Sequence, residues 1–394
     1  MPIKFFEIFE EKLEELKKNY LYRSINDIDS KTTMEIIIDG KKFINFASND
    51  YLGLSQHPVV KQAAIEAIKI FGVGAGASRL LSGGTIIHKK LEELLCEFKN
   101  TQSSLILNSG YTANTSLIPS IAQENDIIFS DELNHASIID GCRLSKAEKI
   151  IYKHCELEDL QKLLKNSNCK GKKIIITDTV FSMDGDIAPI KELYELCKNE
   201  EALLYLDDAH GTGVLGDGFG ALRHFKLNPD ESIIQMGTFS KALGAFGAFV
   251  CSSSTLINWF INSARGFIFS TALPPSIVAS AYASLKIIKE DKSLIKKLWQ
   301  NTLQVKEIIN NLELKTTNTQ TPIIPILFED IESAKNASKL LQDFYIYAPL
   351  IRPPTVKTPR IRLTVTAAHT LEDIERLKEA LKNLQGQIGM GIKI

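Results

Sequence analysis

The stretch "SIIQMGTFSKALGAFG" (residues 232–247) contains one charged side chain, that of Lys241. The run 232–236 is rich in apolar residues, which is typical of a buried strand. Lys241 follows this run among small and apolar neighbours. Because lysine is strongly hydrated and prefers the surface, its place directly after a buried strand indicates a function.

Other short β-rich runs alternate with helical patterns between about residue 100 and residue 255. They read "SSLIL", "DIIFS", "KIIYK", "KKIIITDTV", "ALLYLDD" and "GAFVCS", with helix-like stretches such as "LEDLQKLLKN" and "IKELYELCKNE" between them. Apolar strands separated by helices predict an α/β fold with a mostly parallel sheet covered on both faces. Ligands of such sheets bind at the carboxyl ends of the strands. We therefore expect functional side chains directly after each run.

The chain of 394 residues is long enough for two or three structural units. Beyond residue 275 a long helical stretch leads to "PIIPILF", a helix near 331–344, "RIRLTVT" and a final helix near 371–385. This order of helices and strands predicts a smaller α+β domain at residues 291–394 and a large domain at 51–290. Residues 1–50 are expected to pack with the small domain.

The composition argues against several classes of protein. The net charge of −1 gives no electrostatic case for binding nucleic acid or an anionic membrane. The amphipathic N terminus is unlike a signal peptide, and no run is long enough to span a bilayer. The scattered cysteines predict reduced thiols in the cytoplasm rather than a disulfide frame or a metal site. They are Cys96, Cys142, Cys155, Cys169, Cys197 and Cys251.

Polar residues follow several of the predicted strands. "NSGYTAN" after the first run opens a helix, and a helix N terminus is a common phosphate site. "DELNHASI" places His135 at the start of another helix, and "FSMDGD" supplies Ser182 and Asp184. Each of these signals is weak alone, since caps and turns use the same residue types.

The strongest of these groups is "DDAHGTG", in which Asp207, Asp208 and His210 directly follow an apolar strand. Together with Thr238 and Lys241, the strand ends supply a lysine, an acid, a histidine and hydroxyl groups. Pyridoxal phosphate requires this set: the lysine amine condenses with its aldehyde, and an acid keeps its ring nitrogen protonated. A dry pocket lowers the pKa of the amine and makes it a nucleophile and a base.

Two nucleotide-binding motifs would indicate other cofactors. "GVGAGAS" (72–78) has the glycines of a dinucleotide loop, but it follows a helical pattern instead of a strand. The sequence has no G-x-x-x-x-G-K-[ST] loop. Nicotinamide-dependent redox chemistry and phosphoryl transfer are therefore not favoured.

Nine motifs in order resemble those of the α-oxoamine synthase family of fold-type I pyridoxal-phosphate enzymes. They are "FASNDYLGL", "GAGASRLLSGG", "SGYTAN", "DELNHASI", "VFSMDGDIAPI", "LDDAHGTGVLG", "TFSKALGAFGAF", "FIFSTALPP" and "IRPPTV…RIRLTVTAAHT". The resemblance runs nearly from end to end. It implies an aspartate-aminotransferase-like fold and a homodimer with shared active sites.

The resemblance also implies roles for individual residues. Lys241 would carry the cofactor and remove the α-proton, and Asp207 would pair with the ring nitrogen. His135 would stack on the ring and also contact the substrate, while the other cofactor contacts would come from Gly110, Tyr111, Ser182, His210 and Thr238. Asn49 and Arg362 would bind the amino-acid carboxylate, and Arg23 and Thr355 the acyl substrate. Thr85 would reach the phosphate in a neighbouring subunit.

Within the family, "ARGFIFSTALPP" and "IRPPTV" are most similar to the branch that condenses L-alanine with a pimeloyl thioester of coenzyme A or acyl carrier protein in biotin biosynthesis. Ser78 stands where glycine-using relatives commonly have Thr, and the smaller side chain leaves room for the methyl group of alanine. The segment "RPPTVKTPRIR" is about two residues shorter than in some relatives, which bears on the acyl contacts.

Other reactions stay open at this point. Relatives in the family condense glycine with an acetyl or succinyl thioester, or serine with a long acyl chain. A simple aminotransferase and a catalytically silent regulatory module are further alternatives. The condensing-branch motifs disfavour the aminotransferase. The fold is expected to begin almost at residue 1, which would leave no room in this sequence for a DNA-binding domain of the kind that such regulators carry.

Overall fold

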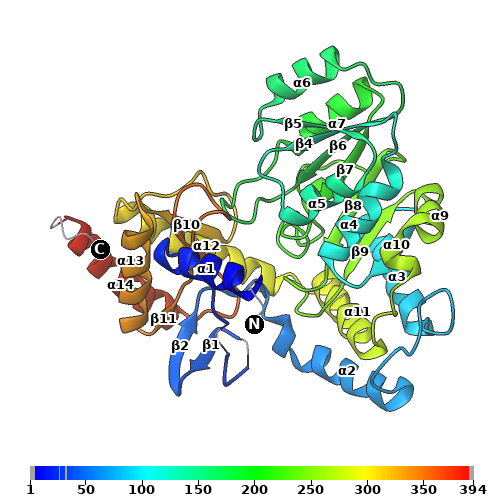
Figure 1. Cartoon of the computed structure of the whole chain (residues 1–394). Helices are drawn as coiled ribbons and strands as arrows, with labels where there is room; N and C mark the ends of the chain where they lie inside the picture. Colours follow the sequence, from blue (N-terminus) through cyan, green and yellow to red (C-terminus); the bar gives the residue numbers. More distant parts are fainter. Residues whose placement is uncertain (1–4, 26, 32, 390–394) are drawn as a thin grey trace.

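A seven-stranded sheet forms the core of the larger part of the computed structural model, on the right in Figure 1. The structure describes residues 5–25, 27–31 and 33–389. The strand order of this sheet is β3-β9-β8-β7-β6-β4-β5. Strands β5, β4, β6, β7 and β8 pair in parallel, and β9 runs antiparallel to both of its neighbours. The strands are β3 (Ser103–Leu107), β4 (Ile127–Asp131), β5 (Glu148–Tyr152), β6 (Lys173–Asp178), β7 (Leu203–Asp207), β8 (Ile233–Thr238) and β9 (Ala248–Ser252). The mostly parallel sheet predicted from the alternating runs is thus present.

Both faces of this sheet are buried, which explains why its strands are apolar without a polar alternate face. Successive residues of one strand enter different cores: Ile174 and Ile176 of β6 pack on one side and Ile175 on the other. The helices of this part of the chain are α2 (Pro58–Phe71), α3 (Ile86–Lys99), α4 (Gly110–Ile121), α5 (Ala136–Leu144), α6 (Leu157–Asn166), α7 (Ile190–Asn199), α8 (Ala221–His224), α9 (Ser254–Ser263), α10 (Arg265–Ile268) and α11 (Pro275–Glu290). Helix α2 packs on α11 instead of on the sheet.

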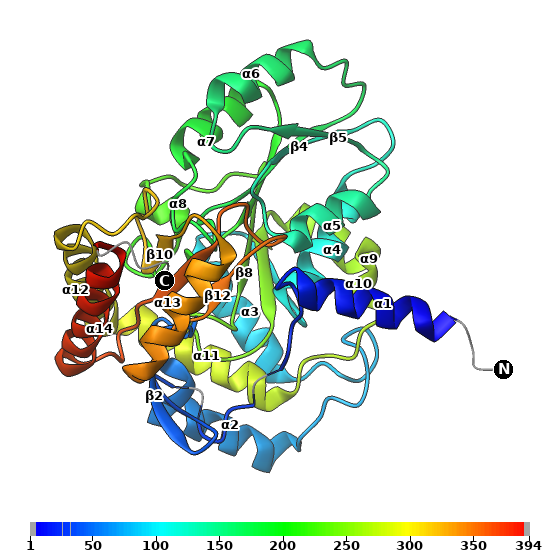
Figure 2. The same cartoon turned by 60° about the vertical axis from the view of Figure 1, so that its left-hand side comes forward.

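The C-terminal part forms a separate layer of sheet and helices with its own apolar core (Figure 2). One small sheet has the order β10-β13-β12 and the other the order β1-β2-β11. Their strands are β1 (Glu35–Ile38), β2 (Lys41–Asn45), β10 (Ile323–Leu327), β11 (Ile346–Tyr347), β12 (Leu350–Ile351) and β13 (Arg360–Thr364). The helices are α12 (Ser293–Asn311), α13 (Ile331–Asp343) and α14 (Leu371–Gly389), and η1 (Leu54–Gln56) is a short 3₁₀ turn.

One part of the N-terminal segment is buried against the C-terminal part, and another part is exposed. Ile44 and Phe46 are buried in the same core as Val305 and Ile324 of the C-terminal part. Helix α1 (Phe5–Lys18), by contrast, has no buried residue and extends along the outside of the molecule (Figure 2). The domain boundaries near residues 50 and 290 stay a prediction.

One sequence expectation needs correction. The long helix expected beyond residue 275 is two helices, because α11 ends at Glu290 and α12 begins at Ser293. The carboxylate of Asp291 accepts hydrogen bonds of 2.8 Å from both the backbone N–H and the hydroxyl of Ser293. Such local side-chain bonding competes with helix continuation. No helix in the described part of the chain is both long and apolar enough for a membrane span.

Candidate functional site

Lys241 lies in a tight loop that follows β8. The backbone N–H of Gly244 donates to the carbonyl of Lys241 at 2.9 Å, and Gly244 has a φ of 60°. A Cβ at this glycine would lie 2.2 Å from the backbone nitrogen of Ser55, so the loop packs directly on that segment. Burial lowers the pKa of Lys241 to about 8, against the opposing pull of Asp207 and Asp178. A much larger fraction of this amine is therefore neutral near pH 7 than for an ordinary lysine.

Asp207 ends β7, the strand beside β8, and its side chain is buried. One carboxylate oxygen accepts a hydrogen bond from the Asn114 side-chain amide at 2.8 Å, and the other accepts from the backbone N–H of Ala209 at 3.0 Å. Burial raises the pKa of Asp207, while Lys241, Asn114 and Ala209 act in the opposite direction. This carboxylate is held at a fixed place where it can pair with a protonated ring nitrogen.

Two histidines lie beside these groups. The Nδ1 atom of His210 is 2.7 Å from the hydroxyl of Tyr51. Burial, with the nearby Lys241, holds the pKa of His210 well below its usual range, so its ring is neutral at physiological pH. His135 caps α5, and its backbone N–H donates to Asp178 at 2.7 Å. The charge of Lys241 contributes to the pKa shifts of Asp207, His135 and His210, so these predicted residues lie near one another.

A buried guanidinium reaches this site from β13. The Nη2 atom of Arg362 donates to Asn49 Oδ1 at 3.1 Å, and its Nε donates to the carbonyl of Ser182 at 2.6 Å. The charge of Arg362 lowers the pKa of Lys241, so the two cations are close. The predicted pair of Asn49 and Arg362 is therefore in contact and can receive a carboxylate.

The predicted phosphate-binding groups come from two elements. Helix α4 begins at Gly110, where a Cβ would meet no atom within 4 Å. Thr238 ends β8, and its hydroxyl donates to the carbonyl of Gly247 at 2.7 Å. Tyr111 is half exposed, and its hydroxyl donates to Asp140. The start of α4 and the open space at Gly110 suit an anion, and one N–H group of this helix end is already capped by the Ser109 hydroxyl.

The remaining predicted residues make their contacts elsewhere. Thr85 caps α3 through His88, and Ser78 forms an isolated bridge with Thr271. Arg23 and Thr355 are exposed and meet each other, with 3.5 Å between Nη2 and Oγ1. Within the described part of the chain none of these four forms a hydrogen bond with Lys241, and the roles predicted for them stay predictions.

Sequence reasoning missed several polar residues at the site. Asp178 is buried at the end of β6, and Asn114 lies one helical turn after Gly110 in α4. The strand-end rule could have found Asp178, because it follows the apolar part of "KKIIITDTV" and ends β6 as Asp207 ends β7. Asn114 and Tyr51 give no comparable signal, since each is one polar group in a helix or loop.

Asp208, the second acid of "DDAHGTG", forms a buried ion pair. Asp208 accepts a hydrogen bond from the Lys99 ammonium at 2.8 Å, and the two side chains are 3% and 1% exposed. Lys99 also donates to Thr212 at 2.8 Å and to the carbonyl of Phe219 at 2.8 Å. This buried ion pair fixes the loop that carries His210, so Asp208 is a structural residue.

The arrangement fits pyridoxal phosphate on the residues present. A lysine with a lowered pKa, a buried carboxylate, and a helix N terminus with open space at Gly110 follow strands β8, β7 and β3 of the same sheet. These are the groups needed for the aldehyde, the ring nitrogen and the phosphate.

Comparisons with known proteins agree with this geometry. Residues 41–381 match the family model for aminotransferase class I and II. A protein of Thermodesulfovibrio yellowstonii, provisionally named 8-amino-7-oxononanoate synthase, is 75% identical over 97% of this chain and 98% of its own. The 8-amino-7-oxononanoate synthase of Thermoanaerobacter pseudethanolicus is 45% identical over 98% of both chains. A solved structure of SPT with PLP has a TM-score of 0.91 at 28% identity and covers 100% of both chains. The predicted fold-type I architecture and the resemblance inferred from the motifs are confirmed.

Proposed function

The chain belongs to the aminotransferase class I and II family, and we propose that it acts within this family as an 8-amino-7-oxononanoate synthase. The reaction joins L-alanine to a pimeloyl thioester and releases carbon dioxide and the free thiol, a step of biotin biosynthesis. The names of the full-length relatives support the substrates. The chemistry rests on one arrangement, in which Lys241, Asp207 and Arg362 converge at the strand ends.

We assign the cofactor site to residues of four elements. Lys241 would hold pyridoxal phosphate covalently, and Asp207 would hold the proton of its ring nitrogen. The N terminus of α4 and Thr238 would bind the phosphate, while His135 and His210 would contact the ring. When bound, this cofactor supplies an electron sink for the negative charge that deprotonation leaves on the α-carbon.

The amino-acid substrate is positioned by a separate set of groups. Arg362 and Asn49 would bind the carboxylate of L-alanine, and this fixes the α-carbon relative to Lys241. The Nζ atom of Lys241, once free, would accept the α-proton. Its lowered pKa suits this role, because a larger fraction of the amine is neutral near pH 7 than for an ordinary lysine, and only the neutral amine can take a proton.

We assign the acyl substrate to the exposed contact between Arg23 and Thr355. Arg352 lies beside them: its guanidinium donates to the carbonyl of Tyr22 at 2.7 Å, and Arg23 contributes to the lowered pKa of Arg352, whose main cause is burial. Two guanidinium groups at this place suit the distal carboxylate of a pimeloyl chain. The carrier, coenzyme A or acyl carrier protein, is left open.

We propose that the protein is a homodimer with shared sites. Large apolar side chains are exposed in the segment that contains the predicted residues Ser78 and Thr85, among them Val73, Leu80, Leu81 and Ile86. A second copy that covered this segment would bring Thr85 to the phosphate of the neighbouring site. Sedimentation equilibrium of the cofactor-loaded protein tests this assembly, and a monomer at working concentration would contradict it. We place the protein in the cytoplasm on the basis of its free cysteines.

The experiment that tests the proposed function is a substrate panel. Purified protein with pyridoxal phosphate is given alanine, glycine or serine together with acetyl, succinyl, pimeloyl or palmitoyl thioesters, and the released thiol is measured. We expect alanine with the pimeloyl thioester to give the highest kcat/KM. Preference for another pair would assign the chain to another α-oxoamine synthase.

A further inference from the structure

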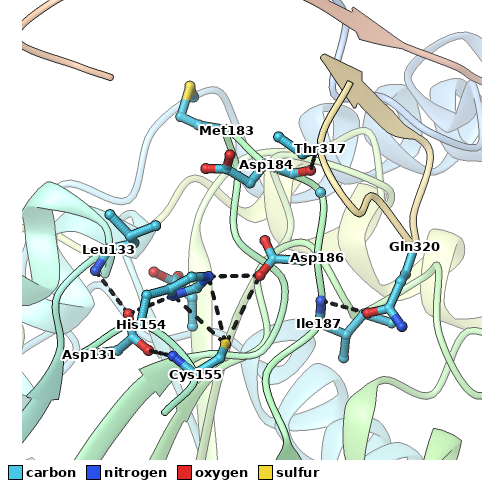
Figure 3. Close-up of polar contacts among 12 residues, drawn as sticks. Asp131, Leu133, His154, Cys155, Met183, Asp184, Asp186, Ile187, Thr317 and Gln320 are labelled. Atoms are coloured by element: carbon cyan, nitrogen blue, oxygen red, sulfur yellow. Dashed lines mark hydrogen bonds and ion pairs between the residues drawn. The ribbon is translucent and has the colours of Figure 1, made fainter. Parts of the chain in front are cut away.

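A histidine outside the site, His154, is held between two carboxylates just beyond strand β5 (Figure 3). Its Nδ1 atom lies 2.9 Å from Asp131 Oδ1, and its Nε2 atom lies 2.8 Å from Asp186 Oδ2. The ring also packs edge-on against Phe181, with 4.3 Å between the ring centroids. His154 therefore connects the end of β4 to the turn at residues 182–187.

This geometry fixes the protonation state of the ring. Carboxylates only accept hydrogen bonds, so both ring nitrogens of His154 must donate, and the ring is an imidazolium. Burial opposes the charge, but the hydrogen bonds from the ring to Asp131 and Asp186 outweigh it and raise the pKa of His154 to about 12. The ring keeps its charge throughout the physiological pH range.

The two carboxylates depend on His154 to different degrees. Asp131 is buried and also accepts hydrogen bonds from the backbone N–H groups of Leu133 at 2.8 Å and Cys155 at 2.9 Å. Asp186 has a buried Oδ1 atom without a hydrogen-bond partner among the described residues. The imidazolium is thus the main group that compensates the charge of Asp186.

The turn at 182–187 is the point where the large sheet meets the C-terminal layer. The Arg360 Nη1 atom donates to Asp184 Oδ1 at 2.7 Å, and the Thr317 hydroxyl donates to the carbonyl of Asp184 at 2.6 Å. A Cβ at Gly185 would lie 2.2 Å from the carbonyl oxygen of Ile323, so the turn has no free space on that side. Figure 3 shows Asp186 on the side of the turn facing His154, while Asp184 contacts Thr317.

The same turn holds the guanidinium of the site. Ser182 accepts the hydrogen bond from Arg362 Nε through its backbone carbonyl, so a shift of the turn moves this acceptor. Arg362 then loses one of the contacts that orient it toward Asn49. A displacement of this kind is enough to weaken carboxylate binding, because bidentate recognition depends on geometry.

We propose that His154 is a positioning residue, which clamps the 182–187 turn through Asp186 and thereby aligns Arg362 for the carboxylate of the amino-acid substrate. The inference rests on the proposed function only in its need for an amino-acid substrate. His154 would thus orient Arg362 indirectly, a role that the sequence motifs did not assign.

A metal site is the competing interpretation of this cluster. Potential ligand atoms of Asp131, His154 and Cys155 lie within 4.8 Å of one another. A metal needs an unprotonated ring nitrogen, whereas both nitrogens of His154 face carboxylate oxygens at hydrogen-bond distance. The observed geometry therefore favours the imidazolium.

The test compares ligand affinities of the cofactor-loaded wild type and His154→Gln. Dissociation constants for L-alanine and for L-alaninamide, which lacks the carboxylate, are taken from the change in cofactor absorbance. We expect the Kd for alanine to rise about tenfold, as for a loss of coupling of about 1.4 kcal/mol, and the Kd for alaninamide to change less than about twofold. His224→Gln, at an exposed histidine of α8, is the matched control.

The double variant His154→Gln/Asp186→Asn tests whether the unpaired charge of Asp186 causes the loss of affinity. Removing this carboxylate should restore at least part of the alanine affinity. The same variant can be measured in place of His154→Gln if the single variant folds poorly. Three results would overturn the proposal. The first is an unchanged Kd for alanine in folded His154→Gln, and the second is an equal loss of affinity for alanine and alaninamide. The third is stoichiometric zinc in the wild type that His154→Gln lacks.

These outcomes are separable from a failure of the proposed function. If the wild type prefers glycine or serine, the same comparison is made with that amino acid and its amide, since all carry the same carboxylate. The thioester is not needed in this experiment, so the identity of the acyl substrate does not affect the result.

Discussion

The Nη2 atom of Arg362 lies 3.1 Å from the side-chain oxygen of Asn49, although 313 residues separate them in the chain. The contact joins the loop after β2 to β13 and places a buried guanidinium next to the charge of Lys241. This relationship gives the site a place for a carboxylate beside a base. We propose that this pair receives the carboxylate of the amino-acid substrate.

Replacing Arg362 by Lys should raise the KM for alanine by about 10- to 100-fold, because one charged hydrogen-bonding group contributes about 1.5–3 kcal/mol. The cofactor absorbance should stay unchanged, since Arg362 is assigned to the substrate. Steady-state kinetics and the visible spectrum measure the two effects. Arg376→Lys, at an exposed position of α14, is the control, and an equal effect of both substitutions would contradict the role of Arg362.

Replacing Asn114 by Ala should move the acid limb of the pH–rate profile to higher pH. The Asn114 amide donates to Asp207 and lowers the pKa of this carboxyl, so its loss raises that pKa. Below the raised pKa Asp207 is protonated and cannot pair with a cationic ring nitrogen. The acid limb is read from kcat/KM between pH 5 and pH 8, and an unchanged limb in an otherwise folded variant would refute this coupling.

The covalent attachment of added pyridoxal phosphate to the cofactor-free chain should speed up with pH and level off near pH 8. Burial lowers the pKa of Lys241 to about 8 from the usual 10.5, and only the neutral amine is nucleophilic. The rate is followed by absorbance at a fixed cofactor concentration. A rate that keeps rising to about pH 10.5 would show that the lysine has an ordinary pKa.

Replacing Lys99 by Met should lower the free energy of unfolding by about 3–5 kcal/mol, because it leaves the buried Asp208 carboxylate without its partner. Urea denaturation of the cofactor-loaded protein measures this change. Lys89→Met breaks a pair with Glu93 whose side chains are 70% and 62% exposed, and it should cost less than about 1 kcal/mol. Similar costs for the two substitutions would mean that Lys99 is not essential to the fold.

The sequence alone predicted the sheet and the residues at its strand ends. Strands β6, β7 and β8 have apolar runs that end in polar residues, and Lys241 and Asp207 follow from this local pattern. The sequence reading missed the helix break at Asp291, because apolar residues keep their helical spacing across this position. The Asp291 carboxylate there accepts a hydrogen bond from the backbone N–H of Ser293.

The contacts that complete the site could not be predicted in this way. Asn114 reaches Asp207 from a helix 93 residues away, and Tyr51 reaches His210 across 159 residues. Such pairings depend on how sheet and helices pack, which no local period encodes. The motif resemblance supplied the pair of Asn49 and Arg362, but it gave no indication of the His154 clamp.

The fate of the alanine carboxyl carbon tests the central claim most directly. Purified protein with pyridoxal phosphate and a pimeloyl thioester is given L-alanine labelled with carbon-13 either at the carboxyl carbon or at the α-carbon, and the products are analysed by mass spectrometry. The account predicts that the carboxyl label leaves as carbon dioxide and that the α-carbon label is retained in 8-amino-7-oxononanoate, with no turnover by Lys241→Ala. Labelled pyruvate as the main product, or full activity of Lys241→Ala, would contradict it.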